Sequence, residues 1–128
     1  MNYLKFGLVP DTNNLTHLVH VQDVSRVLLS SMKEGQGTYI VADTNPIKIA
    51  ELFSEIVRLL GKKPHKIPMW FARLIATLLF KRQYFEVGFA NRAFSIEKIK
   101  KELGFSPTSN FSLELQKMID WYKSKNKA

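Results

Sequence analysis

Histidines are the first candidates for chemistry in this sequence, because a neutral imidazole can bind a metal ion or move a proton near neutral pH. His17 and His20 lie three residues apart, and His65 is distant in the chain. The segment Thr16–Val21 has the composition of a strand, on which side chains three residues apart point to opposite faces. The chain has no cysteine, and no carboxylates cluster beside these histidines. We therefore expect no metal site.

The nucleotide-binding and nucleophile motifs that depend on glycine spacing are absent. Gly35 and Gly37 come nearest to a dinucleotide-binding triplet, but Ile40 occupies the position of the third glycine. The sequence has no Gly-Lys-Ser/Thr phosphate-binding loop and no serine with glycine two residues away on each side. We therefore predict no catalytic residue and no cofactor-binding residue in this chain.

Two arginines are candidates for holding an anionic group of a ligand. Arg82 and Arg92 fall within residues 81–94, which we interpret as a loop with a short strand. Binding residues concentrate in such loops, and the planar guanidinium group matches carboxylate and phosphate oxygens. The alternative for each is an exposed surface arginine without a ligand.

The elements that would position these side chains alternate between short strands and helices. After a loop at Val9–Asn14, strands are predicted at Thr16–Val21 and Thr38–Ala42, joined by a helix over Val24–Lys33. Asp23 is predicted to cap that helix, because a carboxylate can accept the free N–H groups of a first turn. The connection is long enough for the two strands to pair in parallel.

The rest of the chain is predicted to be mainly helical. Asn45 and Pro46 indicate the start of a helix, and Gly61 indicates its end. Ser95 is a candidate N-cap for a later helix, which Gly104 is expected to end by adopting the left-handed conformation. The fold class predicted is α/β (α+β for this piece in isolation), with two or three short strands and four to five helices. The later predicted helices are Pro46–Leu60, Met69–Phe80, Ile96–Leu103 and Ser112–Lys123.

Length, composition and charge set the remaining limits. The 128 residues are enough for one domain with its own core, and the lack of cysteine fits a cytoplasmic protein. The net charge of +8 arises in the second half: residues 1–60 carry five basic and six acidic side chains, and residues 61–128 carry fourteen and five. An alternative function is therefore a small basic module that binds nucleic acid or an acidic partner.

The apolar segment Met69–Phe80 raises a membrane alternative. It is interrupted by Arg73 and Thr77 and is shorter than the roughly 20 residues of a membrane span, so no span is predicted. Trp70 and Phe71, with basic residues on both sides of the segment, would suit a helix lying on a membrane surface. Such a helix normally shows a polar face, which this segment lacks, so burial is the favoured interpretation.

Three segments, in this order, carry a resemblance to a known enzyme family. They are HLVHVQDVSRVLL (residues 17–29), GTYIVADTNPIKIAELFSEIVRLLGKKP (residues 37–64), and AFSIEKIKKELGFSP with SLELQKMIDWYK (residues 93–107 and 112–123). The first resembles the V-H-V-x-D-V-A stretch of the extended short-chain dehydrogenases/reductases, in the NAD-dependent epimerase/dehydratase family. The second is similar to the strand, turn and helix that follow that stretch, and the third resembles the family's ending, with its L-G-F/W-x-P helix stop.

The resemblance implies the C-terminal, substrate-binding lobe of a Rossmann-type enzyme. In that family the dinucleotide site and the Tyr-x-x-x-Lys catalytic pair lie in the N-terminal half, and here no tyrosine has lysine four residues later. The resemblance therefore implies that an N-terminal domain holding NAD or NADP is missing, and that this chain alone binds no cofactor and is inactive. Within a single domain, 1–128, residues 16–61 would return to the cofactor domain and residues 62–128 would form the substrate lobe.

The resemblance also suggests substrate contacts, for a sugar-like or other hydroxylated metabolite. Relatives acting on nucleotide diphosphate sugars often have arginine four residues before His20, where this chain has Thr16, which argues against a diphosphate sugar. His20 is expected either to face the substrate or to bond the backbone. Thr16, His20, Arg82 and Arg92 form the expected substrate-binding set. Strands without their sheet neighbours would leave open edges, so either self-association or a partly disordered N-terminal segment is also predicted.

Overall fold

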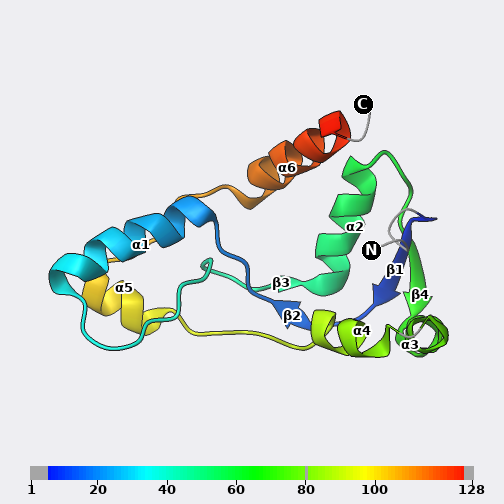
Figure 1. Cartoon of the computed structure of the whole chain (residues 1–128), viewed down its shortest axis with the longest axis horizontal. Helices are drawn as coiled ribbons and strands as arrows, with labels where there is room; N and C mark the ends of the chain where they lie inside the picture. Colours follow the sequence, from blue (N-terminus) through cyan, green and yellow to red (C-terminus); the bar gives the residue numbers. More distant parts are fainter. Residues whose placement is uncertain (1–5, 80, 126–128) are drawn as a thin grey trace.

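The computed structural model describes residues 6–79 and 81–125, and in these ranges the chain forms short strands and six helices. This mixture matches the predicted fold class. In Figure 1 the elements form an elongated arrangement, with α1 and α5 side by side at one end and α3 and α4 at the other. The elements are β1 (Leu8–Asp11), β2 (Leu15–Thr16), α1 (Val21–Glu34), β3 (Ile47–Lys48), α2 (Ile49–Leu59), β4 (His65–Pro68), α3 (Met69–Leu78), α4 (Arg82–Gly88), α5 (Glu97–Leu103) and α6 (Phe111–Lys125).

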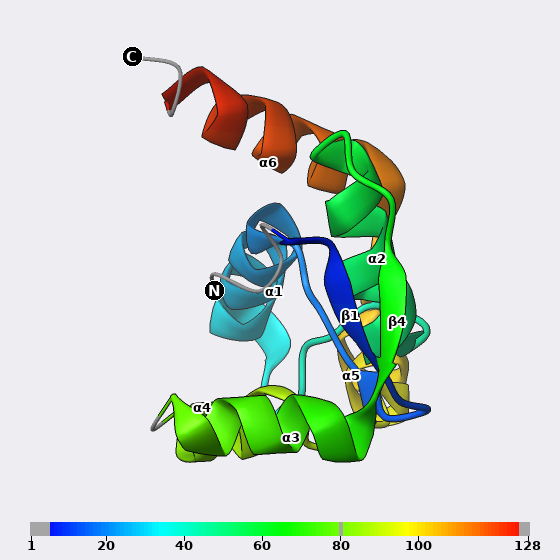
Figure 2. The same ribbon diagram turned by 90° about the vertical axis from the view of Figure 1, so that its right-hand side faces the viewer.

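One hydrophobic cluster surrounds a parallel pair of strands. β1 and β4 pair from Leu8 opposite His65 to Asp11 opposite Pro68, and α2 packs on β1 (Figure 2). The apolar positions of α2 recur at helical spacing, so one face of the helix is buried against the strands. The buried members are Val9, Ile49, Ala50, Phe53, Val57, Ala72, Ala76, Phe85 and Phe89.

A second hydrophobic cluster lies at the opposite end, between α1 and α5. Val27 of α1 meets Ile99 of α5 there, together with Ala42, Ile96 and Phe105. The Phe105 side chain returns to this cluster because Gly104 adopts φ 59°, a left-handed conformation that turns the chain after α5. The predicted helix stop at Gly104 is therefore confirmed.

The strand predictions are wrong in position. The strand β1 (Leu8–Asp11) overlaps the predicted loop Val9–Asn14, whereas of Thr16–Val21 only Thr16 belongs to a strand. Thr38–Ala42 forms no strand in the described part of the chain. A strand exists only where another backbone accepts and donates its hydrogen bonds in a continuous ladder. Among the described residues, Thr16 pairs with Ile47 and the Asp43 N–H donates to the Leu18 carbonyl at 2.8 Å, but no ladder extends along either segment.

Several helix boundaries also differ from the predictions. His20, not Asp23, is the N-cap of α1, and α2 begins at Ile49 rather than at Pro46. Residues 81–94, expected to be a loop with a strand, contain the helix α4, whose Phe85 is buried in the first cluster. Tertiary burial of Phe85 thus outweighs a locally ambiguous sequence.

Candidate functional site

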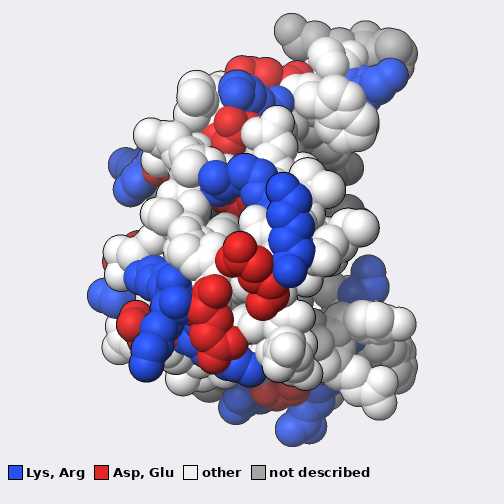
Figure 3. Space-filling model, turned by 90° about the vertical axis from the view of Figure 1, so that its left-hand side faces the viewer, with Lys and Arg blue, Asp and Glu red and all other residues white. Residues whose placement is uncertain are grey.

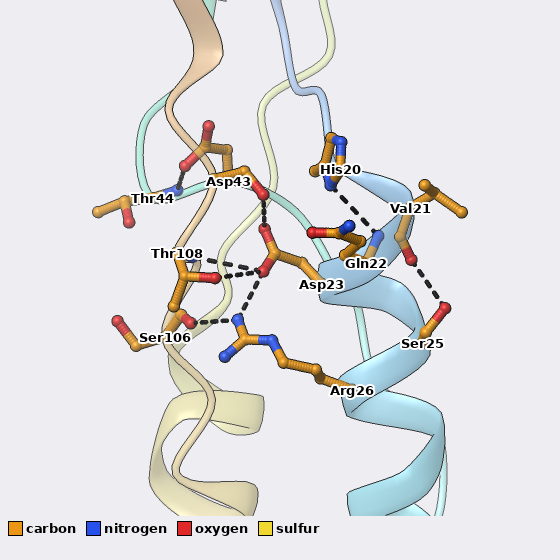
Figure 4. Close-up of polar contacts among 11 residues, drawn as sticks. His20, Val21, Gln22, Asp23, Ser25, Arg26, Asp43, Thr44, Ser106 and Thr108 are labelled. Carbon is orange, nitrogen blue, oxygen red and sulfur yellow. Dashed lines mark hydrogen bonds and ion pairs between the residues drawn. The ribbon is translucent and has the colours of Figure 1, made fainter. Parts of the chain in front are cut away.

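Asp23 fixes the first turn of α1 against the segment that precedes α6 (Figure 4). The carboxylate is 2% exposed and accepts hydrogen bonds from the Thr108 hydroxyl at 3.2 Å and the Ser109 hydroxyl at 2.9 Å. Arg26, one turn later, donates to the same carboxylate at 2.5 Å and to the Ser106 carbonyl at 3.0 Å. A buried carboxylate with this many donors is fully satisfied, so its role is to hold two distant segments together.

The environment of Asp23 keeps its carboxylate charged. Burial raises its pKa, but the hydrogen bonds from Ser109, Arg26 and Thr108 together outweigh burial and place the pKa below its ordinary value. The charged carboxylate thus joins the start of α1 to the segment before α6, and His20 and Ser109 of this junction line one side of a groove.

The groove lies beside this junction and has a volume of about 590 Å³. Leu52 and Ile56 of α2 and Leu115 and Met118 of α6 supply its apolar walls. The segment before α1 supplies a third wall, which includes His20. An apolar groove with a few polar groups at its edge is the common form of a small-molecule site. Its other lining residues are Leu18, Val19, Asp43, Ser109, Phe111, Glu114 and Lys117.

His20 and Glu114 supply polar groups to the lining of the groove. The His20 Nδ1 atom accepts the Gln22 backbone N–H at 3.3 Å, so in the neutral ring the proton resides on Nε2. That Nε2 atom is 3.4 Å from a Glu114 carboxylate oxygen. Lys117 donates to Glu114 at 2.8 Å and, with smaller contributions from its charge and from His20, lowers the pKa of Glu114 against the opposing effect of burial. The groove can therefore both donate and accept hydrogen bonds, as recognition of hydroxyl groups requires.

The other expected binding residues do not converge with His20. Thr16 pairs with Ile47 in the β2–β3 ladder, and the Arg92 backbone N–H donates to the neighbouring Leu15 carbonyl at 2.8 Å. Thr16 and Arg92 therefore lie in one region. Arg82 is elsewhere, exposed at the start of α4 and 3.9 Å from Glu86. These four residues do not form one constellation, and their roles as substrate contacts stay predictions.

Sequence reasoning did not single out several of the groove residues. Asp43 follows the segment Thr38–Ala42 that was expected to be a strand, and Glu114 lies in the first turn of α6. Three small hydroxyl residues just before α6, Ser106, Thr108 and Ser109, are the signal that indicates partners for a buried carboxylate such as Asp23. The described residues contain no group of three or more side chains suited to a metal ion.

On the face drawn in Figure 3, the basic charges do not form an uninterrupted surface. On the face in Figure 3, acidic side chains lie among the basic ones. Alternation of this kind neutralises the local field, so it gives no specific support to a nucleic-acid surface. Ion pairs join Arg26 to Asp23, Lys48 to Glu51, Arg58 to Glu55, Lys66 to Asp11, Arg73 to Glu86, Lys100 to Glu97 and Lys117 to Glu114.

Comparison with curated proteins finds one relevant likeness. The chain is 28% identical, over 142 aligned residues, to short-chain dehydrogenase/reductase family 42E member 1 of Mus musculus. The alignment covers 89% of this chain and 35% of the mouse protein. No family model matches the chain.

Solved structures share the fold. A dTDP-glucose 4,6-dehydratase from Bacillus anthracis, in complex with NAD, superposes with a TM-score of 0.65 at 21% identity, over 98% of this chain and 38% of that one. DesIV, a dTDP-glucose 4,6-dehydratase from Streptomyces venezuelae with NAD and TYD bound, gives 0.65 at 23% identity, over 96% and 36%. The chain thus spans little more than a third of the length of these proteins. The likenesses confirm the predicted resemblance and the fold class.

Proposed function

We propose, from the premise that this chain has the fold of the C-terminal part of an extended short-chain dehydrogenase/reductase, that it is the substrate-binding part of an NAD(P)-dependent enzyme. The enzyme would be an epimerase, dehydratase or reductase of a sugar-like or other hydroxylated metabolite. Within residues 1–128, we assign residues 16–61 to the return toward the cofactor domain and residues 62–128 to the substrate lobe.

The groove between α2 and α6 is the observation that carries this proposal. Its apolar walls would cover one face of a ring, while Glu114 accepts and His20 donates hydrogen bonds at the edge. Lys117 adds a cation beside Glu114, 2.8 Å away. Thr16, Arg82 and Arg92 would contact the remainder of a ligand held against a second domain.

An exposed apolar helix face and an extended segment without a strand partner support a companion domain. Leu28, Leu29 and Met32 expose most of their side chains along one side of α1. Thr38–Ala42 runs nearby without a strand partner among the described residues, although its composition is that of a strand. An apolar helix face beside an unpaired extended segment is suited to docking against the edge of a sheet. We assign NAD or NADP binding and the chemical step to that companion domain.

The test is a binding measurement on the chain itself. Backbone amide shifts in NMR would be followed while methyl β-D-glucopyranoside, dTDP-glucose, NAD⁺ or NADP⁺ is added. We expect the glucoside to shift amides at the start of α1, along α2 and in the first turns of α6, weakly and saturably. We expect NAD⁺ and NADP⁺ to leave the spectrum unchanged and no probe to be turned over.

A matched pair of variants controls for general effects of charge. Glu114→Gln with Lys117→Ala removes the charged pair of the groove, and we expect the glucoside shifts to disappear. Glu97→Gln with Lys100→Ala removes an exposed pair of the same spacing on α5 and should leave them unchanged. Specific NAD⁺ binding, unaided turnover, or glucoside shifts that survive the first double variant would contradict the proposal.

A further inference from the structure

α3 carries an exposed apolar face. Trp70, Leu74 and Leu78 are 68%, 48% and 69% exposed, and Phe71 is 40% exposed. At 3.6 residues per turn these four positions fall within an arc of about 100° on one side of the helix. In Figure 2, α3 and α4 lie side by side as a layer that forms one end of the molecule. We call these four side chains the α3 face.

The opposite side of α3 is buried in protein. Ala72 and Ala76 belong to the first hydrophobic cluster, where Phe85 and Phe89 stack with ring centroids 4.6 Å apart. A helix that lies alone on a bilayer needs a polar side for water, but a helix built into a domain does not, since protein covers that side. The absence of a polar face, which favoured burial at the level of sequence, therefore does not oppose an interfacial position.

The charges around α3 match an anionic surface. Lys63 and Lys66 precede the helix, Lys81 and Arg82 follow it, and all four are exposed. The one charge within the helix, Arg73, is held by Glu86 of α4 at 2.7 Å. Lys66 pairs with Asp11, but both are more than half exposed, so solvent screens that pair strongly. Basic residues thus stand at both ends of an apolar stripe.

We propose that the α3 face binds the surface of a membrane that contains anionic lipids. Tryptophan favours the boundary between headgroups and acyl chains, and lysines beside it attract anionic headgroups. Exposed Tyr84 and Val87 of α4 extend the apolar layer. Among the described residues no helix is long and apolar enough to cross a bilayer, so the contact is peripheral. This proposal does not depend on the proposed enzymatic role.

Vesicle flotation with the full chain tests the proposal. Vesicles of phosphatidylcholine alone would be compared with vesicles in which a third of the lipid is phosphatidylglycerol. We expect flotation with the anionic vesicles, and a marked loss of it when salt is raised, since salt screens the lysines. In Trp121→Phe, Trp70 is the sole tryptophan, and its fluorescence should shift to shorter wavelength on binding.

Matched triple variants locate the contact. Trp70→Gln with Leu74→Gln and Leu78→Gln should lower the vesicle partition coefficient by about tenfold or more, since apolar area is lost from the contact. The matched control is the triple Gln variant of Leu28, Leu29 and Met32, three exposed apolar residues on α1. It should bind vesicles like the parent chain. All six positions are exposed, and circular dichroism would verify that both variants fold.

Three outcomes would overturn the proposal. The first is no flotation on anionic vesicles at low salt. The second is equal loss in the α1 and α3 triple variants, which would indicate unspecific apolar adhesion. The third is a dimer in gel filtration that only the α3 variant abolishes, with no vesicle binding by the parent, which would assign the α3 face to a second copy of the chain.

Discussion

At the scale of single residues, Asp23 shows what local sequence can and cannot predict. The sequence predicts that Asp23 caps the helix, because capping is the role that its neighbours in sequence suggest. The structure gives the cap to His20, and Asp23 instead bonds Thr108 and Ser109, which are 85 and 86 residues away. No local pattern encodes a partner at that distance. For the same reason His20 was recognised without Glu114, its neighbour in the groove.

The first prediction concerns the stability of the Asp23 junction. Asp23→Ala should lower the free energy of unfolding by about 1–3 kcal/mol, because the Thr108 and Ser109 hydroxyls and the Arg26 guanidinium lose their acceptor. Urea titration followed by circular dichroism measures this change. Asp120→Ala, an exposed aspartate whose partner is Gln116, is the control and should alter stability by less than about 0.5 kcal/mol.

The second prediction follows from the lowered pKa of Asp23. A carboxyl group whose folded pKa lies below its unfolded pKa stabilises the fold above the unfolded value, and this contribution is lost as pH falls through the folded value. Acidification below about pH 4 should therefore destabilise the parent chain more steeply than Asp23→Asn. Equal pH dependence of the two urea midpoints between pH 5 and pH 2.5 would contradict this assignment.

At the scale of elements, helices were easier to predict than strands. α2, α3, α5 and α6 follow from apolar spacing within one segment, so their existence was predicted and only their ends moved. β1 and β4 depend on each other across 57 residues, and the sequence of neither one identifies the other. α4 was missed because residues 81–94 have no clear apolar period.

A third prediction separates two glycines by their backbone conformation. Gly104→Ala should lower the free energy of unfolding by about 1 kcal/mol, since φ 59° is unfavourable for a residue with a Cβ although no atom would clash with it. Gly88→Ala, in the last turn of α4 and equally uncrowded, should be neutral or raise it by up to about 1 kcal/mol. Loss of stability in Gly104→Ala without loss in Gly88→Ala, in parallel thermal melts, confirms the assignment, and equal losses would refute it.

At the scale of the whole molecule, the resemblance correctly indicated the fold class, but it could not place the segment Thr38–Ala42. That segment has the composition of a strand, and its conformation here is decided by the absence of a strand partner among the described residues. The exposed apolar side chains of α1, Leu28, Leu29 and Met32, likewise belong to neither hydrophobic cluster of this chain. Self-association through such edges stays a prediction.

A fourth prediction tests the role of Thr38–Ala42. Amide hydrogen exchange at Thr38 and Ile40, the exposed residues of this segment, should be as fast as in exposed loops, whereas amides of α2 should be strongly protected, because α2 is packed in the first cluster. Raising the protein concentration should protect Thr38–Ala42 if two copies pair their edges, and gel filtration would then show a dimer. Slow exchange at low concentration, where the chain is a monomer, would contradict the unpaired assignment.

The interleaving of the two hydrophobic clusters has a consequence for how the polypeptide is made. The first cluster needs both Val9 and Phe89, and the second needs both Val27 and Phe105. Neither cluster can form before the last of its residues has been synthesised and has left the ribosome. Translation proceeds at roughly 5–20 residues per second. For several seconds the nascent polypeptide therefore exposes apolar segments that have not yet packed. Segments of this kind are what a chaperone at the ribosome exit tunnel binds.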